Sequence, residues 1–195
     1  FGVDLFVTPL SFFTWFFHAI FLNSQTCEHS WRMHRVFVYG TLKRSFFNHH
    51  ILATQSAEFV RTATTIQAFS LFVDCCWIPY ATKTKSTIRK TPASHTPTPL
   101  TGELFNIDEH TLERLDLLEG IHEQRYTREH IQLQDDQEPA YIYLLNNPPL
   151  HHSSHHHYIT HYNLHEHQQL YVPPKERGSI LSSSTTSTAS SSSSS

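Results

Sequence analysis

The sequence is poor in cysteine and carries no excess of positive charge. Its three cysteines are Cys27, Cys75 and Cys76, and the adjacent pair suits a relaxed disulfide poorly, which excludes a disulfide-stapled secreted domain. We therefore expect reduced thiols and a cytoplasmic protein. A formal net charge of −3, with histidine neutral, gives no electrostatic basis for binding nucleic acid.

The first 32 residues contain an apolar stretch, 5–22, that lacks the flanking charges of a targeting signal. Pro9 and His18 interrupt it and no basic residue precedes it, so it fits neither a membrane span nor a signal peptide well. Met33 is the single methionine and lies three residues before the first strand-like run. We expect residues 1–32 to come from an over-extended or truncated gene model, with the physiological start at Met33. A genuine anchor or signal, which would place the protein at a membrane, and an extension packed on the fold are the alternatives.

The other end of the chain is also unlike its middle. Residues 179–195 are mostly Ser and Thr and cannot bury enough apolar area to offset the entropy of ordering, so we expect residues 178–195 to be disordered. Residues 33–177 are long enough for one domain with its own core.

The stretch Val36–Lys43 joins a short strand pattern to a glycine turn. Val36, Phe37 and Val38 are β-branched or aromatic, as buried strands favour. Gly40 then permits a sharp turn, at which successive backbone N–H groups can converge on an anion or a carbonyl oxygen. A turn without any ligand is the alternative.

The rest of the domain shows several strand patterns and one clear helix. Asp108 suits an N-cap, Glu109–Leu118 carries leucines at near-helical spacing, and Gly120 suits a C-terminal stop. We expect an exposed loop over 83–99 and a short helix or turn over 48–52. Strands are expected as two segments within 59–73 separated by a turn, and at 102–107, 126–133 and 140–145. Without regular βαβ alternation, the predicted class is α+β, a small mixed β-barrel flanked by short helices.

Glu119 is the strongest candidate for chemistry. It lies four residues after Leu115 and seven after Leu112, so its side chain should point with the core stripe of the helix. Burial and the negative end of the helix dipole would both raise the pKa of its carboxyl, which suits a general base working near neutral pH. A solvent-facing glutamate before a C-cap glycine is the alternative.

Three motifs, taken in order, resemble the γ-glutamylcyclotransferase superfamily and within it most of all the γ-glutamylamine cyclotransferases. They are Tyr39-Gly40-Thr41-Leu42-Lys43 with Asn48-His49, Gly102-Glu103-Leu104-Phe105-Asn106-Ile107-Asp108, and Leu115-Asp116-Leu117-Leu118-Glu119-Gly120 followed by Tyr126-Thr127-Arg128. The resemblance runs, with gaps, from about Met33 to Arg177. It implies the same mixed β-barrel with helices.

The resemblance also implies an activity. A γ-glutamyl amine such as γ-glutamyl-ε-lysine would cyclise to 5-oxoproline and release its amine, with Glu119 as general acid and base. Gly40, Thr41 and Leu42 would bind substrate through their N–H groups, with Tyr39 and Tyr126 beside them. Tyr39 could equally be a core aromatic. The implied enzyme needs no metal or organic cofactor, its partner is the small-molecule substrate, and we expect a monomer.

Some features leave alternatives open. Ser45 stands where the superfamily usually has glycine, so the turn there is expected to be strained or different. Arg128 could pair with Asp116 or Glu123. The leaving group could instead be an amino acid, and a non-catalytic binding module on the same fold is a third reading. The histidine-rich region between His151 and His167 could bind metal, but we interpret it as a biased loop. Cys75 and Cys76 could be redox-reactive, although ordinary core thiols are the default.

Overall fold

A computed structural model of the chain describes residues 33–54, 56–83, 96–147 and 156–177. The expectations for the N-terminal extension, 1–32, and for the Ser/Thr-rich tail, 178–195, lie outside these residues. The boundaries of the domain at 33 and 177 therefore stay predictions.

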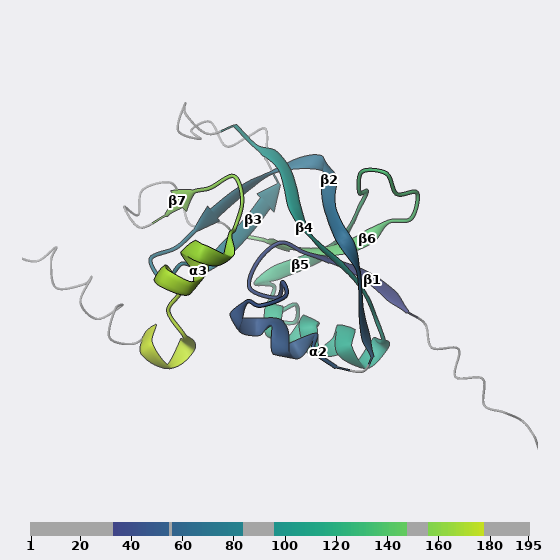
Figure 1. Cartoon of the computed structure of the whole chain (residues 1–195), viewed down its shortest axis with the longest axis horizontal. Helices are drawn as coiled ribbons and strands as arrows, with labels where there is room; N and C mark the ends of the chain where they lie inside the picture. Colours follow the sequence, from purple (N-terminus) through teal and green to yellow (C-terminus); the bar gives the residue numbers. More distant parts are fainter. Residues whose placement is uncertain (1–32, 55, 84–95, 148–155, 178–195) are drawn as a thin grey trace, which may run out of the picture. The chain divides into compact units, whose positions relative to one another are not determined.

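The described strands form one mixed sheet (Figure 1). Its path runs β3-β2-β4-β1-β6-β5, and β7 pairs with β2. β1 lies antiparallel to β4 and parallel to β6, which makes the sheet mixed and confirms the predicted α+β class. The strands are β1 (His34–Val38), β2 (Ala57–Val73), β3 (Pro79–Lys83), β4 (Thr98–Ile107), β5 (Tyr126–Ile131), β6 (Ala140–Leu145) and β7 (His157–Tyr158).

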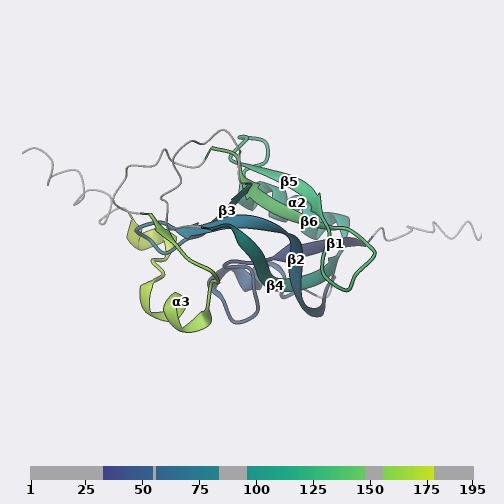
Figure 2. The ribbon, with the colours of Figure 1, turned by 90° about the horizontal axis from the view of Figure 1, so that it is seen from above.

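The sheet curls without closing into the expected barrel (Figure 2). β3 and β5 are the two ends of its path and do not pair with each other. An isolated bridge between Thr65 and Leu133 joins β2 to the chain just after β5. The backbone N–H of Ile66 donates to Gln132 O at 2.9 Å beside this bridge. The described strands therefore form an open, curled sheet and not the closed barrel that the sequence analysis predicted.

β2 is a single long strand, where the sequence predicts two strands and a turn. Its register against β4 shifts between Thr64 and Ala68, so a bulge replaces the predicted turn. Thr65 is fully buried in this bulge, where its hydroxyl donates to Gln67 O at 2.7 Å and accepts from the N–H of Leu100 at 2.9 Å. These two bonds satisfy the backbone groups that the interrupted ladder leaves over.

The helix α2 (Glu109–Glu119) begins and ends as its sequence predicts. The Asp108 carboxylate accepts from the N–H of Thr111 at 2.8 Å, and Gly120 takes a left-handed φ of 64° at the C-cap. Together with the short helix η1 (Phe47–Ile51), α2 covers one face of the sheet (Figure 1). Alternation along β1 turns Val36 toward this face and Phe37 toward the other.

The C-terminal part carries elements that the sequence did not predict, α3 (Leu164–Leu170) and η2 (Pro174–Glu176). His167 on α3 is buried, so here the expected biased loop is wrong. The N–H of Phe47 donates to its Nε2 at 3.1 Å, and its Nδ1 lies 2.7 Å from the Tyr162 hydroxyl, which itself donates to Trp77 O. These bonds require a neutral ring with its proton on Nδ1. Burial, aided by the Lys43 ammonium, correspondingly lowers the pKa of His167.

Gly102 lies at a close approach between β4 and β1. A β-carbon at this position would lie 2.3 Å from the carbonyl oxygen of Val38 and 2.7 Å from the Phe37 ring. We expect Gly102→Ala to lower the free energy of unfolding by about 1–3 kcal/mol, because backbone of β1 must move to admit the methyl group. Urea denaturation of the full chain would measure this loss. The neighbouring exposed Thr101→Val is the control and should change stability by less than about 0.5 kcal/mol; an equal loss in both variants would contradict the steric explanation.

Candidate active site

The turn after β1 presents three consecutive backbone N–H groups that have no acceptor among the described residues. Those of Gly40, Thr41 and Leu42 donate to no group in the described part of the chain. The turn is nevertheless closed, since the N–H of Lys43 donates to Gly40 O at 3.2 Å. Such a run of free donors is an anion-binding arrangement.

The Asn48-His49 pair holds this turn in place. The Asn48 side-chain amide donates to the Thr41 hydroxyl at 2.9 Å, and its backbone N–H donates to Thr41 O at 3.0 Å. The Nδ1–H of His49 donates to Leu42 O at 3.1 Å. Both side chains thus shape the turn, and the Thr41 hydroxyl is already engaged.

The connection between β2 and β3 packs directly on the turn. A β-carbon at Gly40 would lie 2.8 Å from Cγ of Pro79, the first residue of β3. Glycine at position 40 is therefore required by contact with another part of the chain. The chain before β3 therefore lies beside the candidate site at Pro79.

Ser45 departs from the superfamily's glycine, and its backbone shows the consequence. Its φ is 72°, in the left-handed region that glycine adopts most easily. The strain predicted from the sequence at this turn is therefore present.

The C-terminal end of α2 is fixed to the sheet through Asp116. Arg128 of β5 donates to one oxygen of its carboxylate at 2.6 Å, and the Tyr143 hydroxyl of β6 donates to the other at 2.6 Å. Of the two partners considered for Arg128, Asp116 is the observed one; Glu123 pairs with Arg125 instead. These contacts lie one helical turn before Glu119 and determine where its side chain is held.

Glu119 forms no hydrogen bond or ion pair with any residue that the structure describes. Burial raises the pKa of its carboxyl to about 7, and the guanidinium of Arg125 partly opposes this rise. A carboxyl with this pKa is a base and an acid near neutral pH. The inward orientation predicted from Leu112 and Leu115 agrees with this placement.

The two candidate tyrosines differ in what their hydroxyls can still do. The Tyr39 hydroxyl donates to Tyr143 O at 3.0 Å and accepts from the N–H of Ala81 at 3.2 Å, within the core. Tyr126 is buried, but its hydroxyl has no bonding partner in the described residues. Burial raises the pKa of both phenols and the charge of Glu119 raises it further, so the carboxylate lies near both. Tyr126 therefore has a hydroxyl available for a ligand, while that of Tyr39 is occupied.

Two residues beside the site were missed by the sequence analysis. The Tyr80 ring stacks on Tyr126 with 6.4 Å between ring centroids, and its hydroxyl donates to Asp74 at 2.9 Å. The other oxygen of Asp74 accepts from the N–H groups of Cys76 and Ile78. The strand pattern of β3 could have revealed Tyr80. The sequence analysis predicted no strand there and assigned its last residue, Lys83, to a loop.

Within the described ranges, no group of three His, Cys, Asp or Glu side chains is arranged to hold a metal ion. His151, His152 and His155 lie outside those ranges. Cys75 and Cys76 are both free thiols. In the same part of the chain, no helix combines the length and the apolar content needed to cross a membrane.

Chemically, the arrangement combines one proton carrier with several fixed donors. Glu119 can take up and return a proton near pH 7, and the N–H groups of residues 40–42 can hold a carboxylate or a developing oxyanion. Tyr126 adds a further donor.

Comparison with known proteins shows the family to which the chain belongs. The model of the family described as gamma-glutamyl cyclotransferase, AIG2-like, matches residues 36–166. A protein of Methanocaldococcus jannaschii, provisionally named a gamma-glutamylcyclotransferase, is 33% identical over 101 residues, which cover 52% of this chain and 72% of that protein. Gamma-glutamylaminecyclotransferase A of Danio rerio is 33% identical over 117 residues, which cover 55% of this chain and 66% of that protein.

Among solved structures, an AIG2-like protein of Mus musculus superposes with a TM-score of 0.55 and 25% sequence identity. The match covers 74% of this chain and 97% of the mouse chain. The family match includes both the turn at Gly40 and the helix end at Glu119. The chain belongs to the AIG2-like gamma-glutamyl cyclotransferase family and is an enzyme of the cyclotransferase type.

Proposed function

We propose that the chain is a γ-glutamylamine cyclotransferase, which converts an isopeptide such as γ-glutamyl-ε-lysine to 5-oxoproline and the free amine. The main support for this proposal is the Glu119 carboxyl. Burial raises its pKa to about 7, and it has no hydrogen-bond or ion-pair partner among the described residues. It lies near Tyr39, the residue before the free N–H groups of the turn.

The reaction is intramolecular. Glu119, as the carboxylate, takes a proton from the α-ammonium of the γ-glutamyl group, and the freed amine attacks the γ-carbonyl carbon. A tetrahedral oxyanion forms, Glu119 delivers its proton to the leaving nitrogen, and the C–N bond to that nitrogen breaks. The new ring nitrogen then gives up its second proton through the Glu119 carboxylate to the released amine, which departs as an ammonium. One C–N bond forms, one C–N bond breaks, two protons pass from the α-nitrogen to the leaving nitrogen and the carboxylate is regenerated. No electron is transferred, so the scheme contains no redox cofactor.

The fixed donors provide the rest of the catalytic effect. The N–H groups of Gly40, Thr41 and Leu42 bind either the α-carboxylate of the substrate or the oxyanion. The Tyr126 hydroxyl donates a further hydrogen bond from the start of β5. Because these dipoles are held in position before the substrate binds, little reorganisation is needed in the transition state. Holding the γ-glutamyl chain folded brings its own amine within reach of its own carbonyl.

Two considerations support an amine as leaving group, and a third favours catalysis over binding alone. The relative from Danio rerio bears the name of a gamma-glutamylaminecyclotransferase. The turn reads Tyr-Gly-Thr-Leu, whereas glutathione-specific enzymes of the superfamily carry Tyr-Gly-Ser-Leu. A non-catalytic module would have no use for a carboxyl held near neutral pKa. We further propose that the enzyme acts as a monomer in the cytoplasm, where its free thiols stay reduced.

Replacing Glu119 tests the general base directly. We expect Glu119→Gln to lower kcat for release of 5-oxoproline from γ-glutamyl-ε-lysine by about 10²–10⁴-fold, since glutamine cannot transfer the proton. Urea denaturation should show that the variant stays folded. The matched control is Glu113→Gln on the exposed side of the same helix, which should retain full activity. Near-normal turnover in Glu119→Gln would show that another group acts as base.

The pH profile tests the same carboxyl by its pKa. Because the base must be ionised, kcat/KM should rise about tenfold per pH unit below pH 7 and level off above about pH 7. The Arg125 guanidinium favours the ionised form, so Arg125→Gln should move the midpoint to higher pH. Arg114→Gln, which removes a similar charge from α2, should leave the midpoint in place. A midpoint near 4.5 would mean that the carboxyl is not buried in solution.

A substrate panel tests the leaving group. We expect kcat/KM for γ-glutamyl-ε-lysine to exceed that for γ-glutamyl-alanine and for glutathione by about tenfold or more, the size of effect that a few changed contacts produce. Release of 5-oxoproline would be measured for each. Preference for γ-glutamyl-alanine would assign the chain to the amino-acid-specific enzymes, and absence of all turnover would favour a binding module.

A further inference from the structure

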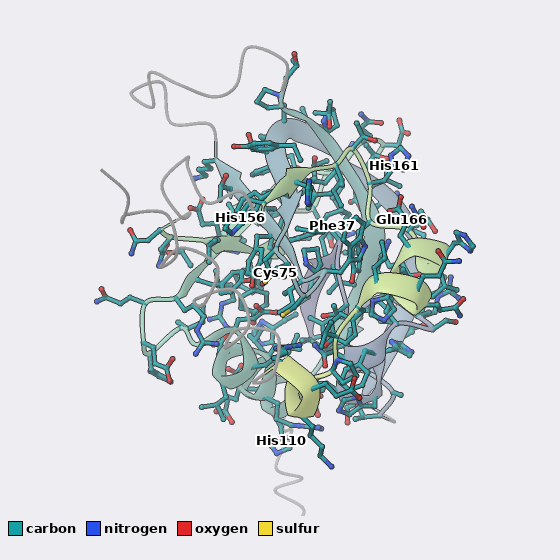
Figure 3. All side chains as sticks on the ribbon, turned by 90° about the vertical axis from the view of Figure 1, so that its left-hand side faces the viewer. Phe37, Cys75, His110, His156, His161 and Glu166 are labelled. Atoms are coloured by element: carbon teal, nitrogen blue, oxygen red, sulfur yellow. The ribbon has the colours of Figure 1, made fainter. Side chains whose placement is uncertain are left out.

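The tip of the β2–β3 hairpin carries two adjacent thiols that the proposed reaction does not use. The Sγ atoms of Cys75 and Cys76 lie 4.0 Å apart. Cys75 is exposed and Cys76 is buried. Figure 3 looks onto the side of the fold that carries β7 and α3 in Figure 1, and Cys75 lies on this side.

The backbone of this tip is firmly held. One oxygen of Asp74 accepts from the N–H of Cys76 at 2.9 Å and from that of Ile78 at 3.0 Å. The carbonyl of Cys76 accepts from the N–H of Val172 in the C-terminal segment at 3.0 Å. Trp77 has a φ of 57°, a left-handed turn that these bonds stabilise. The two thiols are therefore presented side by side on a fixed support.

The spacing favours a bridging atom over a direct disulfide. Adjacent Cα atoms are about 3.8 Å apart across a trans peptide, below the usual range of about 4.4–6.8 Å for a disulfide. Two sulfurs bonded at about 2.3 Å to one pyramidal trivalent atom, with bond angles near about 100°, are about 3.5 Å apart, so the two thiols need to approach by only about 0.5 Å to share such an atom. Among the described residues no third His, Cys, Asp or Glu completes a cation site. The ligand that fits is one that needs two bonds to sulfur and no more.

We propose that Cys75 and Cys76 form a dithiol site for trivalent arsenicals of the type R–As=O, and that occupation of this site lowers turnover. The two S–H bonds and the As=O bond break, two As–S bonds form, and the oxide oxygen leaves with both thiol protons as water. Arsenic stays trivalent, so the step requires no oxidant or reductant.

The two thiols have different parts in this reaction. Burial raises the pKa of the Cys76 thiol to about 11, and its contact with Cys75 adds to the rise. The exposed Cys75 therefore forms the first As–S bond. The second bond is then intramolecular, so the effective concentration of Cys76 compensates for its low ionisation.

The tip is connected to the candidate active site by direct contacts. Pro79, three residues beyond Cys76, packs on Gly40 in the turn after β1, whose N–H groups at residues 40–42 we call the donor turn. Tyr80 stacks on Tyr126. An arsenic atom between the sulfurs draws Cys75 and Cys76 together and alters this support. The effect on turnover rests on the proposed function, whereas binding at the dithiol does not.

The binding test uses the full chain and phenylarsine oxide. Intact mass should increase by one phenylarsenic group less two hydrogens, and the adduct should survive excess monothiol but be reversed by a dithiol such as 2,3-dimercaptopropanol. We expect Cys75→Ser to lose the adduct to monothiol at least about tenfold faster, because only one bond remains. Cys27→Ser is the matched control and should retain the stable adduct.

Two outcomes would overturn the proposal. A monothiol-resistant adduct in Cys75→Ser would show that the pair is not the site. Cys75→Ala repeats the comparison at the same exposed position without adding a hydroxyl. For the activity arm, the adduct should lower the release of 5-oxoproline at least about fivefold in the wild type and Cys27→Ser, with recovery after dithiol. A stable adduct with unchanged turnover would disprove the coupling. Absence of turnover before treatment would count against the proposed function, leaving the mass result to decide the site.

Discussion

The ion pair between Asp116 and Arg128 is the contact on which the position of Glu119 depends. A carboxylate at the end of a helix is disfavoured by the helix dipole, and Glu119 has no hydrogen-bond donor of its own among the described residues. Asp116, one turn earlier, has two strong partners on β5 and β6 and so ties the helix end to the sheet. Asp116 therefore holds the helix end in place, while Glu119 is buried without a hydrogen-bond donor. This burial raises the pKa of the Glu119 carboxyl.

Elements whose local sequence determines their ends were predictable. Asp108 and Gly120 define α2 because an N-cap and a left-handed C-cap act within a few residues. The strand β1 was recognised from its local pattern, whereas the strained backbone at Ser45 was expected from the family resemblance. The resemblance to a known family added the pairing of the turn with Glu119, which lies far along the chain and leaves no mark in local periodicity.

Elements that depend on distant partners were not predictable. The 17 residues of β2 remain one strand because Thr65 satisfies the backbone at the bulge with Leu100 of another strand. His167 looked like part of a biased histidine run, yet its buried ring is bonded to Phe47 and Tyr162. Tyr39 was equally plausible as a site or core residue, and only the contacts with Tyr143 and Ala81 show its hydroxyl engaged.

The donor turn has a consequence for how this enzyme family can be mapped. The ligand-binding groups that we propose at residues 40–42 are main-chain amides, which are the same in every amino acid except proline. Alanine substitutions at Thr41 and Leu42 would therefore leave the proposed donors in place, whereas those at Glu119 and Tyr126 would remove the proposed functional group. Drift of side chains at Thr41 and Leu42 can likewise proceed without altering the donors themselves. Replacing single amides by esters would delete one donor at a time and reveal what mutagenesis cannot.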